Sequence, residues 1–150
     1  MKALTLIQPW AWCITHAGKR VENRTWPPPA PLLGERFAIH AGVSRSGAET
    51  VDHLAEQGIV VTGPVHFGAI VATVQLVGVS RDLGPMTIAD GCDARRILAL
   101  AMTQWRMGPI GWVLDDVRVL SEPVPCRGAQ GLWTLPADVE RLVIEREVRS

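Results

Sequence analysis

The sequence predicts a compact α+β barrel of mostly antiparallel strands with a few flanking helices. Most strand-like stretches are short and alternate between apolar and polar residues, while one longer stretch is largely apolar on both faces and is interrupted by Thr73 and Gln75. Only a few segments have the spacing of apolar residues that is typical of helices. The chain has no internal repeat or linker, and its 150 residues can bury a core, so residues 1–150 are assigned to a single domain.

The first half of the chain supplies short strands and two helices. Strands are predicted at residues 3–7, 20–24 and 36–41, and helices at 9–17 and 47–57. The first helix begins at Pro9, which suits a first helical turn, and it places Trp12 and His16 on one face. In the second strand Glu22 and Arg24 point to the same side, because side chains two apart on a strand share a face.

The second half contains a long central strand, two further strands and two helices. Strands are predicted at residues 67–79, 110–120 and 131–135, and helices at 93–105 and about 136–148. The strand at 67–79 is apolar on both faces, which indicates that both are covered. The strand at 110–120 is expected to kink or bulge at Asp115 and Asp116, because two adjacent carboxylates are costly to bury.

Three of the predicted helices have apolar residues at helical spacing, and in the helix at 47–57 and the last helix we expect that face to be buried. The residues of these faces are Val51, Leu54 and Ala55 in the helix at 47–57; Ile97, Leu98, Ala101, Met102 and Trp105 in the helix at 93–105; and Val139, Leu142 and Val143 in the last helix.

Charge is balanced over the whole chain but not along it. The formal net charge is zero and the pI is about 6.9, which argues against a global field that attracts nucleic acid or membranes. Residues 1–47 hold six Lys or Arg and two Glu, a local charge of +4, and the remainder has nine Arg and thirteen acids, a local charge of −4. An anionic ligand should therefore favour the first third of the chain, unless the segregation is chance on a solvated surface.

The cysteines and the hydropathy pattern predict a reduced, cytoplasmic protein. Cys13, Cys92 and Cys126 are odd in number and far apart, so neither a disulfide framework nor a zinc site is expected. No signal peptide or membrane-spanning stretch is predicted. We expect no metal and no cofactor.

Lys19, Glu22 and Arg24 form the group of residues most suited to chemistry. A turn residue and two residues on one strand face project to the same side, and the pairing of Glu22 with Arg24 would fix both side chains. A guanidinium held in this way directs its donors at a phosphate, a carbonyl or a base edge. The alternative is a solvated strand face with a surface ion pair, which contributes little energy.

The aromatic composition favours a base-binding site. The chain has six Trp, no Tyr and two Phe, and Trp10, Trp26 and Trp133 lie beside polar residues in the sequence. An indole face next to directed donors provides the stacking and the edge contacts that a nucleobase needs. The alternative to base binding is that a tryptophan packs in the core or at its rim, and we expect this for Trp105 and Trp112. His40 points away from the apolar face of its strand. It could therefore line a cleft, or it could be a structural histidine held by hydrogen bonds.

Several common catalytic motifs are absent from the sequence. It contains no GxSxG, no HExxH and no Gly-rich phosphate loop before a helix. Conventional hydrolases, metalloproteases and kinases are therefore poorly supported.

The chain resembles the ASCH domain of the PUA-like superfamily over about residues 2 to 136. The resemblance rests on "LTLIQPWAWCITHAGKRVENRTW", on "HAG" at 40–42, on "FGAIVATVQLVGV" and on the ending "IGWVLDDVRVLSEPVPCRGAQGLWTLP". Its most specific part is Gly18-Lys19-x-x-Glu22-x-Arg24, preceded by Gln8-Pro9-Trp10.

The resemblance implies a small PUA-like β-barrel with a cleft that binds RNA or nucleotides and is lined by the Lys, Glu and Arg positions. One branch of the superfamily hydrolyses N4-acetylcytidine with a Lys–Thr–Glu set. Lys19 matches the lysine of that set, whereas Glu22 stands at the threonine position. The partner carboxylate has no clear counterpart, and Asp90, Asp93, Asp115 and Asp116 are the candidates.

The leading hypothesis is an intracellular module that binds RNA, a nucleotide or a modified nucleoside. The predicted ligand-binding residues are Gln8, Trp10, Lys19, Glu22, Arg24, Trp26 and His40. One alternative is an amidohydrolase that removes the acyl group of N4-acetylcytidine-like nucleosides, with Lys19 and Glu22 catalytic, or a ribonuclease. Another is a protein-interaction module with a vestigial cleft. The oligomeric state stays open.

Overall fold

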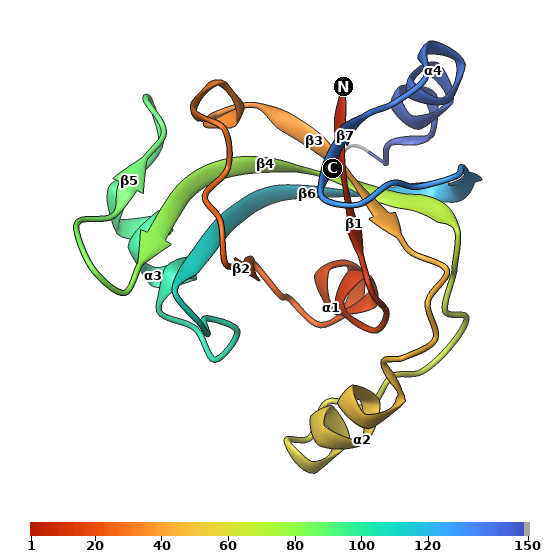
Figure 1. The fold of residues 1–150 in the computed structure, drawn as a ribbon, viewed down its shortest axis with the longest axis horizontal. Helices are drawn as coiled ribbons and strands as arrows, with labels where there is room; N and C mark the ends of the chain where they lie inside the picture. The colour runs from red at the N-terminus through yellow and green to blue at the C-terminus, as the bar shows by residue number, and fades with distance from the viewer. Residues whose placement is uncertain (149–150) are drawn as a thin grey trace. The chain divides into compact units, whose positions relative to one another are not determined.

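A computed structural model describes residues 1–148, which group into two compact units (Figure 1). Unit 1 comprises Met1–Gly18, Phe37–Thr73 and the chain from Arg118 onwards, and unit 2 comprises Lys19–Arg36 and Val74–Val117. Two long strands, β4 (Ala69–Arg81) and β6 (Ile110–Pro125), contribute residues to both units. The assignment of residues 1–150 to one domain stays a prediction.

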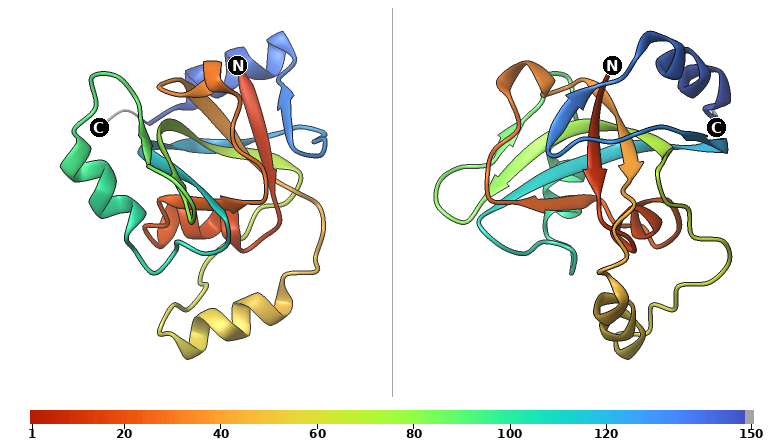
Figure 2. Two further views of the ribbon diagram at one scale, coloured as in Figure 1. Left: turned by 60° about the vertical axis from the view of Figure 1, so that its left-hand side comes forward. Right: turned by 45° about the vertical axis from the view of Figure 1, so that its right-hand side comes forward.

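Unit 1 contains a mixed sheet with β1 (Lys2–Leu6) between two partners. β1 runs parallel to β3 (Arg36–Ala41), with Leu4 opposite Ile39, and antiparallel to β7 (Leu132–Thr134) (Figure 2). The strand order in this unit continues from β3 to β4 and then to β6.

Three helices and an apolar core complete unit 1. The helices are α1 (Trp10–His16), α2 (Ala48–Glu56) and α4 (Ala137–Arg146). One buried cluster consists of aliphatic side chains from five strands or their ends and from α4, namely Ala3, Ala38, Ile70, Leu120, Val124, Leu135 and Val143. All of the strand residues in this cluster except Val124 lie in strands that the sequence predicted.

Unit 2 is built on the antiparallel pairing of β2 (Val21–Arg24) with β6, in which Glu22 lies opposite Trp112. β4 pairs with the short strand β5 (Thr87–Ile88). A 3-10 turn, η1 (Ala30–Leu32), and a helix, α3 (Ala94–Ala101), complete the unit. One buried cluster consists of Val77, Ile97, Ala101 and Val113. β5 was not predicted, because two residues carry no periodic signal. The β1–β3 pair is parallel, whereas the pairs β1–β7, β2–β6 and β4–β5 are antiparallel, which agrees with the predicted predominance of antiparallel strands.

The helix α3 is shorter than predicted and buries a narrower face. It begins after Asp93, whose side chain accepts a hydrogen bond from the backbone N–H of Arg95 at 3.0 Å and caps the helix. Ile97 and Ala101 are buried, but Leu98 and Met102 are 51% and 76% exposed. Helical spacing alone did not specify which of these residues is buried, and the helix packs along only one of its two adjacent apolar rows.

Two other helices also bury less than their sequences predicted. In α2 Leu54 is buried, Val51 is half-buried and Ala55 is exposed. In α4 Val143 is fully buried, whereas Leu142 is 38% exposed. In each of these short helices one side chain is buried, whereas the other apolar residues of the expected face are partly buried or exposed.

β6 is irregular at its two adjacent carboxylates, as the sequence predicted. Asp116 has a φ of +44°, in the left-handed region that non-glycine residues rarely adopt. Asp115 forms two hydrogen bonds with Arg96, at 2.6 and 2.7 Å, and Asp116 pairs with Arg36. Arginine partners thus serve both carboxylates, and the hydrogen bond from Arg96 lowers the pKa of Asp115 although partial burial opposes this. The strand continues to Pro125, five residues beyond the predicted end at 120.

Candidate binding site

The residues from Lys19 to Arg24 form a buried charged network in unit 2. Gly18 has a φ of +72°, a conformation that favours glycine, and Lys19 follows it, two residues before β2 begins at Val21. β2 then presents Glu22 and Arg24 on one face, as the alternation of a strand requires. The spacing seen in the sequence therefore produces a single cluster.

Glu22 lies between two cations in this network. Nζ of Lys19 donates to Oε1 of Glu22 at 2.8 Å and to the backbone oxygen of Val21 at 2.6 Å. Nε of Arg24 lies 3.1 Å from Oε2 of Glu22. The side chains of Lys19, Glu22 and Arg24 are 2%, 9% and 21% exposed. The alternative of a solvated surface pair is therefore wrong for Lys19 and Glu22.

The network carries two positive charges and one negative charge. Burial of such a group contributes little to stability, because the loss of hydration offsets much of the Coulomb attraction. The excess positive charge and the partly exposed guanidinium of Arg24 instead suit the recognition of an anionic or carbonyl oxygen.

An indole lies beside the guanidinium. Cζ of Arg24 is 5.9 Å from the ring centroid of Trp26, which is half-buried. The rings of Trp26 and Trp112 are nearly perpendicular, with a centroid distance of 5.0 Å and an angle of 88°. Nε1 of Trp112 donates to the backbone oxygen of Trp26 at 3.2 Å. Trp112 itself is fully buried, as predicted, and so holds Trp26 in place.

The structure thus brings together four of the seven predicted ligand-binding residues, Lys19, Glu22, Arg24 and Trp26, within unit 2. Gln8, Trp10 and His40 belong to unit 1. Gln8 is 6% exposed; its Nε2 donates to the backbone oxygen of His66 at 2.9 Å, and its Oε1 accepts from the backbone N–H of Trp12 at 3.0 Å. Trp10 is half-buried at the start of α1.

His40 is held by hydrogen bonds on both ring nitrogens. Nε2 lies 2.8 Å from the backbone oxygen of Cys126, which can only accept, so Nε2 carries the proton. Nδ1 then accepts from the hydroxyl of Thr5 at 3.2 Å, and that oxygen accepts from Nε1 of Trp133 at 3.0 Å. Burial lowers the pKa of His40, and the bond to Cys126 only partly opposes this. These contacts give His40 and Trp133 structural roles, and a role in ligand binding stays a prediction.

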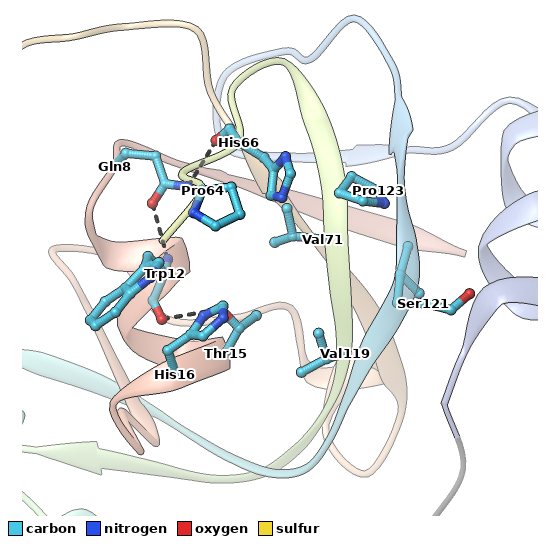
Figure 3. Close-up of a pocket in the computed structure, with 11 residues that line it drawn as sticks. Gln8, Trp12, Thr15, His16, Pro64, His66, Val71, Val119, Ser121 and Pro123 are labelled. Carbon is cyan, nitrogen blue, oxygen red and sulfur yellow. Dashed lines mark hydrogen bonds between the residues drawn. The ribbon is translucent and has the colours of Figure 1, made fainter. Parts of the chain in front are cut away.

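A pocket in unit 1 contains residues that the sequence did not identify as a site (Figure 3). Its volume is about 180 Å³. It is lined by side chains from α1, the loop before β4, and the strands β4 and β6, namely Gln8, Trp12, Thr15, His16, Pro64, His66, Val71, Val119, Leu120, Ser121 and Pro123. Two signals were available in the sequence: Gln8 was among the predicted ligand-binding residues, and Trp12 and His16 were expected to share a helix face, where their rings do stack.

Neither a metal site nor a membrane-spanning helix is found in the described part of the chain. Within residues 1–148 there is no group of three or more His, Cys, Asp or Glu side chains that could hold a metal ion. Over the same residues, no helix has the length and apolar character needed to cross a bilayer.

Comparison with known proteins identifies the fold. No known protein family and no curated protein matches the sequence. Among solved structures, the chain is similar to ASCH from Zymomonas mobilis, with 16% identity and a TM-score of 0.53 over 99% of this chain and 96% of that one. A serine-to-alanine variant of ZmASCH matches with 16% identity and a TM-score of 0.52 over 98% and 96%, and a tyrosine-to-phenylalanine variant with 14% and 0.52 over 98% of both chains. The chain therefore has the α+β fold of the ASCH-domain proteins, as its sequence motif predicted.

Proposed function

We propose that this ASCH-type chain binds RNA, a nucleotide or a modified nucleoside at the network of Lys19, Glu22 and Arg24 beside Trp26. The observation that supports the proposal is the pairing of a buried, net positive network with an indole 5.9 Å from its partly exposed guanidinium. A nucleobase presents a flat face and an edge of carbonyl and amino groups, and this arrangement complements both.

Each residue has a separate role in the proposal. Arg24 donates to a carbonyl or phosphate oxygen, while Trp26 stacks on the base. Glu22 holds Arg24 in position and accepts from an exocyclic amino group. Lys19 supplies the second positive charge and fixes the carboxylate of Glu22.

The charge distribution favours a short or single-nucleoside ligand over tight, sequence-independent binding to a long polyanion. The formal net charge is zero, and sequence-independent affinity for nucleic acid depends on many Lys and Arg contacts to phosphates. The local charge of +4 in residues 1–47 is sufficient for a few phosphates.

The second candidate is an amidohydrolase acting on N4-acetylcytidine-like nucleosides. The contact of 2.8 Å between Lys19 and Glu22 favours it, because an amine and a carboxylate at that distance can exchange a proton during acyl transfer. In the resting arrangement, however, the ammonium of Lys19 donates to two acceptors and has no lone pair for attack. Ligand binding is therefore preferred over amidohydrolase activity as the proposed function.

The test is calorimetric titration with cytidine, N4-acetylcytidine, cytidine monophosphate and a short single-stranded RNA, followed by chromatography of each mixture. The matched variants are Arg24→Gln and Arg141→Gln, since Arg141 is exposed and makes no polar contact within residues 1–148. We expect Arg24→Gln to weaken binding at least tenfold and Arg141→Gln to leave it unchanged. Equal affinity in all three proteins contradicts the proposed site.

The same mixtures separate the enzymatic alternatives. Release of cytidine from N4-acetylcytidine by the wild type, lost in Lys19→Met, would make the protein an amidohydrolase. Cleavage of the RNA would indicate a ribonuclease. If the protein shows neither binding nor turnover, both candidates are contradicted and the protein-interaction module is the hypothesis that is left.

A further inference from the structure

The pocket of unit 1 carries a second inference, independent of the proposed function. We propose that this pocket, called here the His16 pocket, binds an uncharged planar heterocycle of one ring or two fused rings, stacked on the imidazole of His16. It contains none of the residues of the Lys19–Glu22–Arg24 network. The argument rests on a stacked ring pair, on polar groups that have no protein partner, and on the neutrality of the lining.

The stacked pair lies along α1. The rings of Trp12 and His16 are parallel to within 6°, with centroids 5.1 Å apart. Trp12 is 7% exposed and covers one side of the imidazole, whereas His16 is exposed. Figure 3 shows His16 at the pocket, with Val119 on the side opposite it. A planar ring between them extends the stack from two rings to three.

The stacked pair is held rigidly before any ligand arrives. Oγ1 of Thr15 lies 2.6 Å from Nδ1 of His16, which fixes the orientation of the imidazole. Nε1 of Trp12 donates to the backbone oxygen of Thr62 at 3.2 Å. The carboxamide of Gln8 joins the backbone of Trp12 to that of His66, at 3.0 and 2.9 Å, and so ties α1 to the loop before β4. A preorganised platform loses less entropy on binding than a mobile one.

Polar groups at the pocket are available for the edge of a heterocycle. Among residues 1–148, the imidazole of His66, the hydroxyl of Ser121 and Nε2 of His16 have no hydrogen-bond partner. Imidazole nitrogens and a hydroxyl can each donate or accept, so they match the ring nitrogens and amino or oxo groups of a heterocycle. The aliphatic side chains of Val71 and Val119 contact the remaining apolar surface of the ring.

Size and charge define the class of ligand. At about 180 Å³ the pocket is smaller than the ~300–1,000 Å³ typical of sites for drug-sized molecules, so it suits one ring or two fused rings. No Lys, Arg, Asp or Glu is among the described residues that line it. A phosphate, a carboxylate or an ammonium group therefore has no charged partner there, and the ring that binds is neutral.

The experiment is a titration of the protein with cytosine, adenine and the corresponding nucleosides, observed through the imidazole NMR signals of His16 and His66. We expect the His16 signals to move by ring-current shifts, with saturation at millimolar ligand or below. His16→Ala should weaken binding at least fivefold, and Val119→Trp, which fills the pocket from an exposed position, should abolish it. The matched control is His53→Ala, an exposed histidine on α2 outside the pocket.

The outcomes separate this pocket from the Lys19–Glu22–Arg24 network and identify the source of the ring. Shifts that persist in Arg24→Gln and in the presence of inorganic phosphate support a separate, neutral site. If free bases bind and nucleosides do not, an attached ribose prevents binding. If nucleosides bind as tightly as free bases, the base enters the pocket and the ribose stays in solvent. An absence of His16 shifts at saturating base, or equal shifts in Val119→Trp, overturns the proposal.

Discussion

Nζ of Lys19 lies 2.8 Å from Oε1 of Glu22, and both side chains are buried. The carboxylate therefore neutralises an ammonium that has little access to water, while its second oxygen faces Arg24 at 3.1 Å. Removing the negative charge would leave two cations close together without compensation, which is costly in a region of low dielectric constant.

The first prediction is that Glu22→Gln destabilises the protein by about 3–5 kcal/mol, the range for removal of one partner from a buried ion pair. The control is Glu122→Gln, because Glu122 is 74% exposed and lies 3.6 Å from Arg146. That substitution should cost no more than about 1 kcal/mol. The measurement is urea unfolding of both variants, and similar losses in the two would show that burial of the network does not matter.

The second prediction concerns the close approach of Gly128 to His40. A Cβ at position 128 would lie 2.4 Å from Cε1 and 2.6 Å from Nδ1 of the imidazole. Because hydrogen bonds at both nitrogens fix that ring, Gly128→Ala should destabilise the protein by about 1–3 kcal/mol through overpacking. Gln130→Ala, at an exposed position two residues away, should have little effect. Thermal unfolding compares them, and an unchanged melting temperature in Gly128→Ala would contradict the prediction.

The third prediction is a loss of stability in mild acid that depends on His40. Burial lowers the pKa of His40 in the folded state, so the unfolded chain binds the proton first as the pH falls. The free energy of unfolding should therefore decrease as the pH falls through the ordinary histidine value of about 6.5, and this decrease should stop below the folded-state pKa.

Urea unfolding at pH 7.5 and 5.5 checks this prediction. The wild type should lose more stability between the two pH values than His40→Gln, whose side chain does not titrate. His53→Gln, at an exposed position, should behave like the wild type. An identical pH dependence in the wild type and His40→Gln would rule out His40 as the source.

The fourth prediction separates two neighbours on α3. Ile97 is 1% exposed and packs in the core of unit 2, whereas Leu98 is 51% exposed. Ile97→Ala should cost about 2–5 kcal/mol, and Leu98→Ala should change stability by no more than about 0.5 kcal/mol. Chemical denaturation of the two variants provides the comparison, and equal costs would mean that the exposed face of α3 is covered in solution.

Local patterns explain which features could be predicted from the sequence. The strand at 36–41 was predicted with its observed bounds, because its alternation covers the whole element. The cluster of Lys19, Glu22 and Arg24 was also predictable, since its three members lie within six residues and strand geometry alone places two of them on one side.

Features that depend on contacts between distant segments could not be predicted. Thr5 and His40 are opposite each other in the parallel pairing of β1 and β3, but nothing in either strand specifies that register. Likewise, the spacing of Leu98 and Met102 marks an apolar row on α3 without indicating whether another element covers it. The His16 pocket combines α1 with segments more than forty residues away. Only the pairing of Trp12 with His16 and a binding role for Gln8 could therefore be predicted from the sequence.

The position of β1 between β3 and β7 has a consequence for synthesis of the chain. Lys2 and its partner Thr134 are 132 positions apart, so at ~5–20 residues per second the ribosome needs roughly 7 to 26 s to add β7 after β1. Until then β1 has an open hydrogen-bonding edge, and Leu4, which lies opposite Leu132 and is 0% exposed in the finished fold, lacks part of its packing. A nascent chain of this protein therefore presents the kind of surface that chaperones bind, and a chain released early is prone to aggregate.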